Sequence, residues 1–197
     1  MFTQTKSQTP SVYIIHENAE WTAPLFSALE GYQIPYHDWD TSSAIFDLSV
    51  PAPNGIFYNR MSASSHTRGN RFAPEMTTGI LAWLESQGRP TLNGRRALNL
   101  EISKLVQYAA LERVGLSTPK TFAVSSREDI VKAYKALPFD DVITKHNRAG
   151  KGLGVQLLKS EEAAIEHINS SSFEDSVDGL TLVQQYINAP DSSITRV

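Results

Sequence analysis

The sequence of 197 residues contains no cysteine and no long apolar run. Without cysteine, the chain cannot form a disulfide framework, a thiolate metal site or a cysteine nucleophile, and we expect a cytoplasmic protein. No window approaches the roughly 18 apolar residues that a membrane-spanning helix needs, so no membrane partner is expected. Residues 1–10 are polar and lack the apolar core of a signal peptide. They predict a short disordered tail.

Neither sign of charge dominates the chain. Its 18 Lys and Arg residues and 21 Asp and Glu residues give a net charge of −3, and 41% of its residues are hydrophobic. This composition is typical of a globular protein and suggests no nucleic-acid partner. The five histidines never fall in a His-x-x-x-His or Glu-flanked spacing. A zinc site is therefore not predicted, and no metal ligand is assigned.

Two common nucleotide-binding motifs are also missing. The loop around Lys151 is not a Walker A sequence, because Gly152 stands where a Ser or Thr should hold magnesium. A Rossmann fingerprint is absent as well, since the first apolar strand leads into His16, Glu17 and Asn18 without a glycine turn. A Rossmann-type oxidoreductase is therefore disfavoured.

The most informative segment that is present is a basic, glycine-rich loop between two apolar strands, at residues 142–155. Glycines remove the side chains that would keep a ligand away from the backbone, and they permit positive φ angles. Cationic groups surround that bare backbone, which suits a polyphosphate. Its glycines are Gly150, Gly152 and Gly154, and its cations are Lys145, Arg148 and Lys151. Taken alone, the segment predicts equally well a mobile β-hairpin with solvated charges.

Periodicity predicts a first domain with alternating strands and helices, which favours a parallel sheet. Strands are expected at 12–15, 34–39 and 55–58, and helices at 19–29 and 75–87, with Gly88 after the second helix.

Further along, helices are expected at 105–114, 126–137 and 160–168, and strands at 142–145, 153–158 and 180–187. Ser126 and Ser160 are the predicted N-caps of the later two helices.

Four pieces of the second half occur in the order and spacing of a known superfamily. They are Lys104 at a helix start, the segment 115–121, Lys145 with its glycine loop, and the strand at 182–187. Together they resemble the ATP-grasp superfamily, specifically its RimK-like branch with the glutamate ligases and glutathione synthetases. The resemblance implies an α/β fold in which a pre-ATP-grasp, Rossmann-like parallel-sheet domain precedes the N-terminal α+β lobe of an ATP-grasp domain. The implied domains are 11–93 and 94–187, followed by the start of a truncated C-terminal lobe at 188–197.

The resemblance also implies roles for individual residues. Lys104 and Lys145 would contact the nucleotide phosphates, and the loop at 146–154 would close over them. The resulting ATP site comprises Lys104, Lys145, Lys151, Gly152, Gly154, Gln184, Gln185, Ile187 and Asp191. In it the carbonyl of Gln185 and the N–H of Ile187 would bind adenine, and Asp191 the ribose. The alternative for Gln184 and Tyr186 is an edge strand with polar groups in solvent.

Two arginines are assigned to catalysis. Arg60 follows the third strand, where open α/β sheets place ligand-binding residues, and it is assigned to the acceptor substrate. Arg196 matches an arginine of the family. The loop after Arg60 carries Arg68 and Arg71, which either bind a carboxylate or phosphate or are solvated. His66 in this loop is expected to be a turn residue.

The resemblance implies an ATP-dependent ligase that joins a carboxylate to an amine through an acyl phosphate. Its substrates would be small molecules or peptides. The Mg²⁺ ligands of such an enzyme are expected beyond residue 197, so we expect a fragment that cannot complete catalysis. The alternative is a non-catalytic ATP-binding module. In this family the strand at 182–187 would be the hinge between the two lobes of the ATP-grasp domain. Without the second lobe, its exposed edge would pair with a strand of another copy, so a homo-oligomer is also a candidate.

Overall fold

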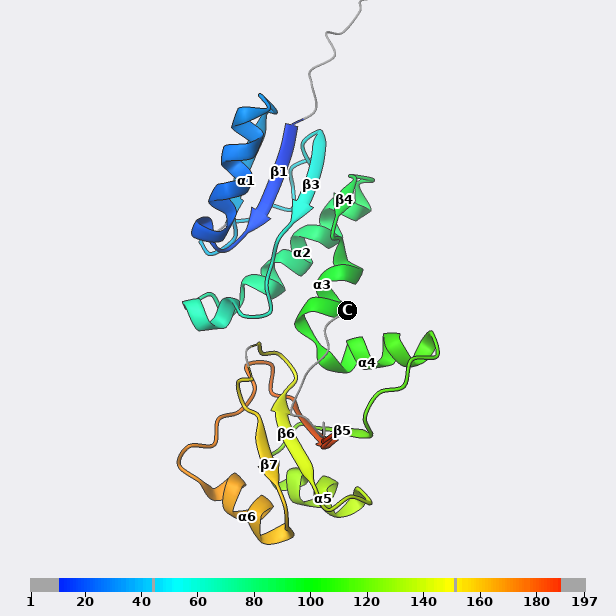
Figure 1. The fold of residues 1–197 in the computed structure, drawn as a ribbon. Coiled ribbons are helices and arrows are strands. Elements are labelled where there is room, and N and C mark those ends of the chain that lie inside the picture. Colours follow the sequence, from blue (N-terminus) through cyan, green and yellow to red (C-terminus); the bar gives the residue numbers. More distant parts are fainter. Residues whose placement is uncertain (1–10, 44, 151, 189–197) are drawn as a thin grey trace, which may run out of the picture. The chain divides into compact units, whose positions relative to one another are not determined.

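The computed structural model describes residues 11–43, 45–150 and 152–188, and the chain forms two compact units (Figure 1). The first covers residues 1–101 and the second residues 102–197. The units therefore divide between Glu101 and Ile102, within the last turn of a helix, whereas the functional domains inferred from the motifs divide at residue 93.

The first unit is built around a sheet with strand order β2-β1-β3-β4, in which neighbouring strands are parallel. Its elements are β1 (Ser11–His16), α1 (Ala19–Gly31), β2 (Tyr36–Asp40), β3 (Gly55–Asn59), η1 (Ser65–Arg68), α2 (Ala73–Ser86), β4 (Thr91–Leu92) and α3 (Arg95–Ile102). The apolar centre of β1 supplies Ile14 and Ile15 to the core, and β3 supplies Phe57, all without solvent exposure. This is the parallel sheet that the alternating pattern predicts.

Local signals in the sequence set several helix ends. The side chain of Asn18 accepts a hydrogen bond from the N–H of Trp21 at 3.0 Å and caps the start of α1. Gly88, directly after the C-cap of α2, has a φ of +67°, as expected for a glycine that ends a helix.

The second unit contains an antiparallel sheet with strand order β5-β8-β6-β7. Its elements are α4 (Lys104–Arg113), β5 (Thr121–Val124), α5 (Glu128–Ala136), β6 (Val142–His146), β7 (Gln156–Leu158), α6 (Glu161–Asn169) and β8 (Thr181–Gln185). The helices α5 and α6 cover one face of this sheet. Their apolar stripes bury Ile130 and Ala164 against Val142, Leu158 and Val183 of the strands.

Three details differ from the sequence prediction. The helix α5 has Arg127 at its N-cap and no side-chain cap, so Ser126 does not cap it, whereas Ser160 does cap α6 through the N–H of Ala163 at 3.1 Å. The short α3 was not predicted. The strand β8 lies between β5 and β6 and is not an edge strand.

Within the described residues, no helix is both long and apolar enough to cross a bilayer.

Candidate nucleotide-binding site

The glycine-rich loop is a hairpin turn between β6 and β7. Val142 pairs with Leu158 and Thr144 with Gln156, so the segment between them reverses the chain. Gly152 and Gly154 have φ angles of +78° and +70°, which other residues rarely adopt. A Cβ on Gly154 would also lie 2.2 Å from Cδ2 of His146. Gly154 is therefore required by packing as well as by its backbone angle. Lys151 lies outside the described residues.

The base of this hairpin is held by Lys104, the first residue of α4. Its Nζ atom donates to the backbone carbonyls of His146 at 3.1 Å, Asn147 at 3.2 Å and Ala149 at 2.7 Å. The three donors of an ammonium group match three carbonyl acceptors on one turn of chain. Lys104 therefore anchors the base of the hairpin, and its ammonium group contacts the residue that precedes Gly150.

A buried amide fixes the same turn from the other side. Asn147 is only 2% exposed, and its Oδ1 accepts from the N–H of Leu105 at 2.9 Å. Its Nδ2 donates to Oδ2 of Asp178 at 2.6 Å and to Oγ of Ser103 at 3.1 Å. Ser103 is in turn the N-cap of α4, through the N–H of Val106. One side chain therefore joins the hairpin to the start of α4 and to the loop before β8.

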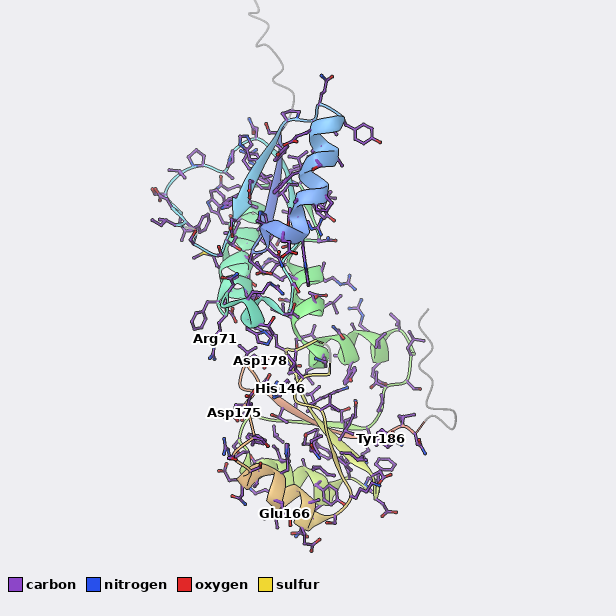
Figure 2. The ribbon with its side chains drawn as sticks, turned by 60° about the vertical axis from the view of Figure 1, so that its left-hand side comes forward. Arg71, His146, Glu166, Asp175, Asp178 and Tyr186 are labelled. Atoms are coloured by element: carbon purple, nitrogen blue, oxygen red, sulfur yellow. The ribbon has the colours of Figure 1, made fainter. Side chains whose placement is uncertain are left out.

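The picture of the side chains agrees with this arrangement. In Figure 2, His146 and Asp178 lie close together at one end of the second unit, whereas Tyr186 lies apart from them. The strand register explains the separation, because His146 pairs with Thr181 at one end of β8 and Tyr186 follows the other end.

The sheet alternation places Lys145 and Gln184 on the same face. Lys145 pairs with Leu182 and Ile143 with Gln184, so these four side chains share one face. The opposite face carries Val142 and Val183, which pack against α5 and α6. The predicted nucleotide contacts of β6 and β8 thus lie on the face that these helices leave uncovered.

Lys145 contacts the aromatic ring of α4. Its Nζ donates to the hydroxyl of Tyr108 and lies 5.1 Å from the ring centroid. A phenol and a π face attract a cation but do not neutralise it. Tyr108 therefore orients the ammonium group of Lys145.

Gln184 is 3% exposed, and its Nε2 donates to Oγ1 of Thr121 at 2.7 Å. The hydroxyl of Thr121 then donates to the carbonyl of Pro119 at 2.7 Å. The donor end of the Gln184 amide is thus occupied, and its acceptor end, Oε1, is the end that can receive a ligand N–H. The interpretation of Gln184 as a polar group in solvent is wrong, because β8 is central.

Backbone hydrogen bonds hold the chain at the end of β8. The N–H of Gln185 donates to the carbonyl of Lys120 at 2.9 Å, and that of Tyr186 donates to the carbonyl of Asp141 at 3.1 Å. Ile187 follows these two residues and is exposed. Asp191 and Arg196 lie outside the described residues.

The candidate substrate residues of the first unit lie at the carboxyl ends of its strands. Arg60 directly follows β3, its N–H donates to the carbonyl of Ile15 at 2.8 Å, and its side chain is exposed. Arg68 forms a bidentate ion pair with the carboxylate of Glu17, in which Nε of Arg68 lies 3.2 Å from Oε2 of Glu17. The side chain of Glu17 is only 2% exposed. The Arg68 side chain, which is 25% exposed, is therefore paired with a carboxylate of the protein itself. His66 lies in the turn η1, as predicted.

Among the residues that the structure describes, no group of three or more His, Asp and Glu side chains is arranged to hold a metal ion.

Some residues of the site could not be found by motif. Asn147, Ser103 and Asp178 are ordinary polar residues in sequence, and only their meeting in space gives them a role. Tyr108 follows Lys104 by four positions on α4, and this one-turn spacing is the only sequence signal that places it beside the lysines.

Comparison with known proteins identifies the fold. No family model and no curated protein sequence matches the chain. Solved structures do match. A RimK-domain ATP-grasp protein from Sphaerobacter thermophilus has a TM-score of 0.62 at 17% identity, over 91% of this chain and 65% of that one. The D-alanine–D-alanine ligase from Bacillus anthracis has a TM-score of 0.63 at 15% identity, over 91% of this chain and 58% of that one.

The ATP-grasp ligase PsnB, solved with a precursor peptide and AMPPNP, has a TM-score of 0.55 at 17% identity, over 94% of this chain and 68% of that one. At these identities the likeness concerns the fold alone. The chain has the ATP-grasp fold, as the resemblance of its motifs implied. It spans less than two thirds of the length of the RimK-domain protein and of the D-alanine–D-alanine ligase.

Proposed function

We propose that this chain, which has the ATP-grasp fold, is the nucleotide-binding part of an ATP-dependent carboxylate–amine ligase of the RimK-like kind. The observation that carries the proposal is the meeting of two lysines and a glycine hairpin at one end of an antiparallel sheet, with Lys104 under the turn and Lys145 on the uncovered face. Cytoplasmic location stays a prediction from the cysteine-free composition.

ATP would be held by groups already positioned in the second unit. Lys104 and Lys145 supply positive charge for the phosphates, and the exposed Gly152 and Gly154 present backbone without side chains. Adenine would lie along the end of β8, where the Oε1 atom of Gln184 can accept from its amino group. The exposed side chains of Tyr186 and Ile187 offer an apolar surface for the ring.

In the ligase reaction, the terminal phosphoryl group of ATP passes to a substrate carboxylate and gives an acyl phosphate and ADP. An amine then attacks the acyl carbon, forms the amide and releases phosphate. The residues of this chain would contribute by positioning the nucleotide and by charge stabilisation. Arg60 would bind the acceptor substrate, a small molecule or a peptide. Mg²⁺ would neutralise phosphate charge in such a reaction, although the described residues contain no group of three or more His, Asp and Glu side chains that could hold it.

ATP binding by the chain tests the proposal. Isothermal titration with ATP should give saturable binding, and Lys145→Met should weaken it about 10- to 100-fold, because a charged hydrogen bond contributes about 1.5–3 kcal/mol. Lys132→Met is the matched control, since Lys132 is an exposed lysine of α5 that pairs with Asp129. Equal affinities of wild type and Lys145→Met would contradict the proposed site.

Ligase activity needs a separate measurement on the full-length protein that contains this chain. Phosphate release from ATP should rise when a suitable amine and carboxylate are supplied from a panel of amino acids and peptides. ATP binding without any stimulation across the panel would instead support the non-catalytic binding module.

A further inference from the structure

The first unit contains a cavity of about 400 Å³ that the proposed ligase function does not use. It lies between β2, α2 and the segment that joins β2 to β3. Its principal wall residues are Tyr13, His37, Trp39, Phe46, Asp47 and Trp83. The volume is within the range of sites that bind small molecules, roughly 300–1,000 Å³.

The cavity lies on the face of the sheet that carries the side chains of Tyr13, His37 and Trp39. Pro53, which lines it, stands just before β3, and Trp83 lies in the last turn of α2, shortly before β4. Arg60, in contrast, follows the carboxyl end of β3. Arg60 is not among the described residues that line the cavity, so the cavity is separate from the place expected for the acceptor substrate.

Aromatic rings belong to five of the ten described residues that line the cavity. The ring of Tyr13 stacks on His37 at 4.4 Å and meets Trp39 edge-on at 6.3 Å. In a second group of rings, Phe46 packs edge-on against Trp83 of α2, with ring centroids 4.8 Å apart. The rings of β1 and β2 face the same side of the sheet, because Tyr13 pairs with His37 across the two strands. A ligand between these two groups would contact several π faces at once.

The polar part of the wall is acidic. Among the described residues that line the cavity, none is a lysine or an arginine, and two are aspartates, Asp38 and Asp47. Asp38 accepts a hydrogen bond from His16 at 2.6 Å, on the other face of β2 from Trp39. Asp47 is the carboxylate available to a ligand. Its Oδ1 accepts from the N–H and Oγ of Ser49, and these bonds lower its pKa, so the carboxylate stays ionised.

The rim of the cavity is apolar and open to solvent. Ile45 is 99% exposed, and Val50 is also exposed, although both line the cavity. Large aliphatic side chains in this position extend the apolar contact area beyond the rings.

We propose that this cavity is a second ligand site, and that it binds a small organic cation with an apolar body, such as a quaternary ammonium compound or a protonated amine. Aromatic faces attract cations through their quadrupole, and aromatic cages for quaternary ammonium groups use several such faces together. The negative charge of the Asp47 carboxylate also attracts a cation. A neutral ligand would gain only the apolar contact, and an anion would be repelled.

The test compares three molecules of the same shape with the intact chain. Choline carries a positive charge, 3,3-dimethylbutan-1-ol is its uncharged isostere, and 3,3-dimethylbutanoate carries a negative charge. Binding can be followed by tryptophan fluorescence, since two of the three tryptophans, Trp39 and Trp83, line the cavity. We expect choline to bind about tenfold more tightly than the alcohol, from cation–π attraction, and the carboxylate not to bind.

Single substitutions test whether choline binds in this cavity. Phe46→Leu keeps an apolar side chain but removes a π face, and Asp47→Asn removes the charge, so each should weaken choline binding about three- to tenfold. Phe72→Leu makes the same chemical change at an exposed ring outside the cavity and should leave binding unchanged. Equal binding of choline and the alcohol, absence of saturable choline binding, or unchanged binding by both cavity variants would each overturn the proposal.

Discussion

Charged groups of the two units, Glu17 in the first and Lys145 in the second, are held in different ways. In the first unit, the carboxylate of Glu17 receives the guanidinium of Arg68 and the amide of Asn70. In the second unit, the ammonium of Lys104 is held by three backbone carbonyls, and that of Lys145 by the phenol of Tyr108. Opposite charges meet at Glu17, whereas a neutral phenol holds Lys145.

This difference indicates which charges stabilise the fold and which remain able to attract a ligand. A carboxylate cancels the charge of its partner, so the Glu17–Arg68 pair has little attraction left for a ligand. Carbonyl oxygens and a phenol orient an ammonium group without cancelling its charge. Among the ion pairs of the described residues, none includes Lys145. Glu17 and Arg68 therefore neutralise each other, whereas Lys145 has no carboxylate partner among these ion pairs.

The largest expected effect comes from Glu17→Gln, which leaves Arg68 without its opposite charge. Removing one partner of a buried ion pair is strongly destabilising, and because Arg68 is partly exposed we expect a loss of about 2–3 kcal/mol in the free energy of unfolding of the first unit. Urea unfolding followed by tryptophan fluorescence measures this unit alone, because Trp21, Trp39 and Trp83 all lie in it.

The comparison also predicts what Glu17→Gln leaves intact. ATP affinity, a property of the second unit, should not change. Glu166→Gln, at an exposed position of α6, is the matched control and should alter neither quantity. A loss of ATP affinity in Glu17→Gln without loss of stability would mean that the Glu17–Arg68 pair is not merely structural.

The next effect concerns the anchoring of the hairpin. Asn147→Ala removes three hydrogen-bonding partners from a buried position and leaves the carboxylate of Asp178 with one fewer donor. Each buried group left unsatisfied costs about 1–3 kcal/mol, so we expect about 2 kcal/mol of local destabilisation. Hydrogen exchange should accelerate across residues 146–154. Asn169→Ala, whose exposed amide bonds only to the carbonyl of Ile165, should not change exchange there.

The sequence predicted those features that depend on neighbouring residues. The hairpin between β6 and β7 follows from glycines that interrupt two apolar runs, and the start of α6 follows from Ser160 three residues before the N–H it caps. Both signals are local, because the chain positions them within a few residues. The ATP-grasp fold followed from four such local motifs in register.

Features that join distant segments were not predicted. Ser103, Asn147 and Asp178 belong to three separate parts of the chain, and each is a common surface residue type until the fold buries it. The Glu17–Arg68 pair joins segments of the first unit that are equally remote. The central place of β8 depends on the order of strands in the sheet, which the apolar pattern of a single strand does not reveal. Pairing partners across long separations are decided by tertiary packing, and a single sequence carries no record of them.

A smaller effect tests the adenine end of the second unit. Gln184→Met keeps the size of the side chain but removes both the donor to Thr121 and the acceptor Oε1. One neutral hydrogen bond contributes about 1 kcal/mol, so we expect ATP affinity to fall about fivefold. Gln156→Met, at an exposed position of β7, is the control. If Gln184→Met leaves ATP affinity unchanged, Gln184 serves only to join β8 to β5.

The smallest effect is a pH dependence confined to the second unit, where His167 lies between Thr144 and Phe173. Burial lowers the pKa of His167, so the folded state resists a proton that the unfolded chain accepts near its ordinary pKa of about 6.5. The stability from neutral His167 is therefore complete above about pH 6.5 and is lost as the pH falls through the lower pKa of the folded state. Hydrogen exchange of β6 and α6 at several pH values measures this loss. His167→Gln, which retains a partner for Thr144 but does not titrate, should flatten the dependence, and an unchanged slope would assign it to carboxylates instead.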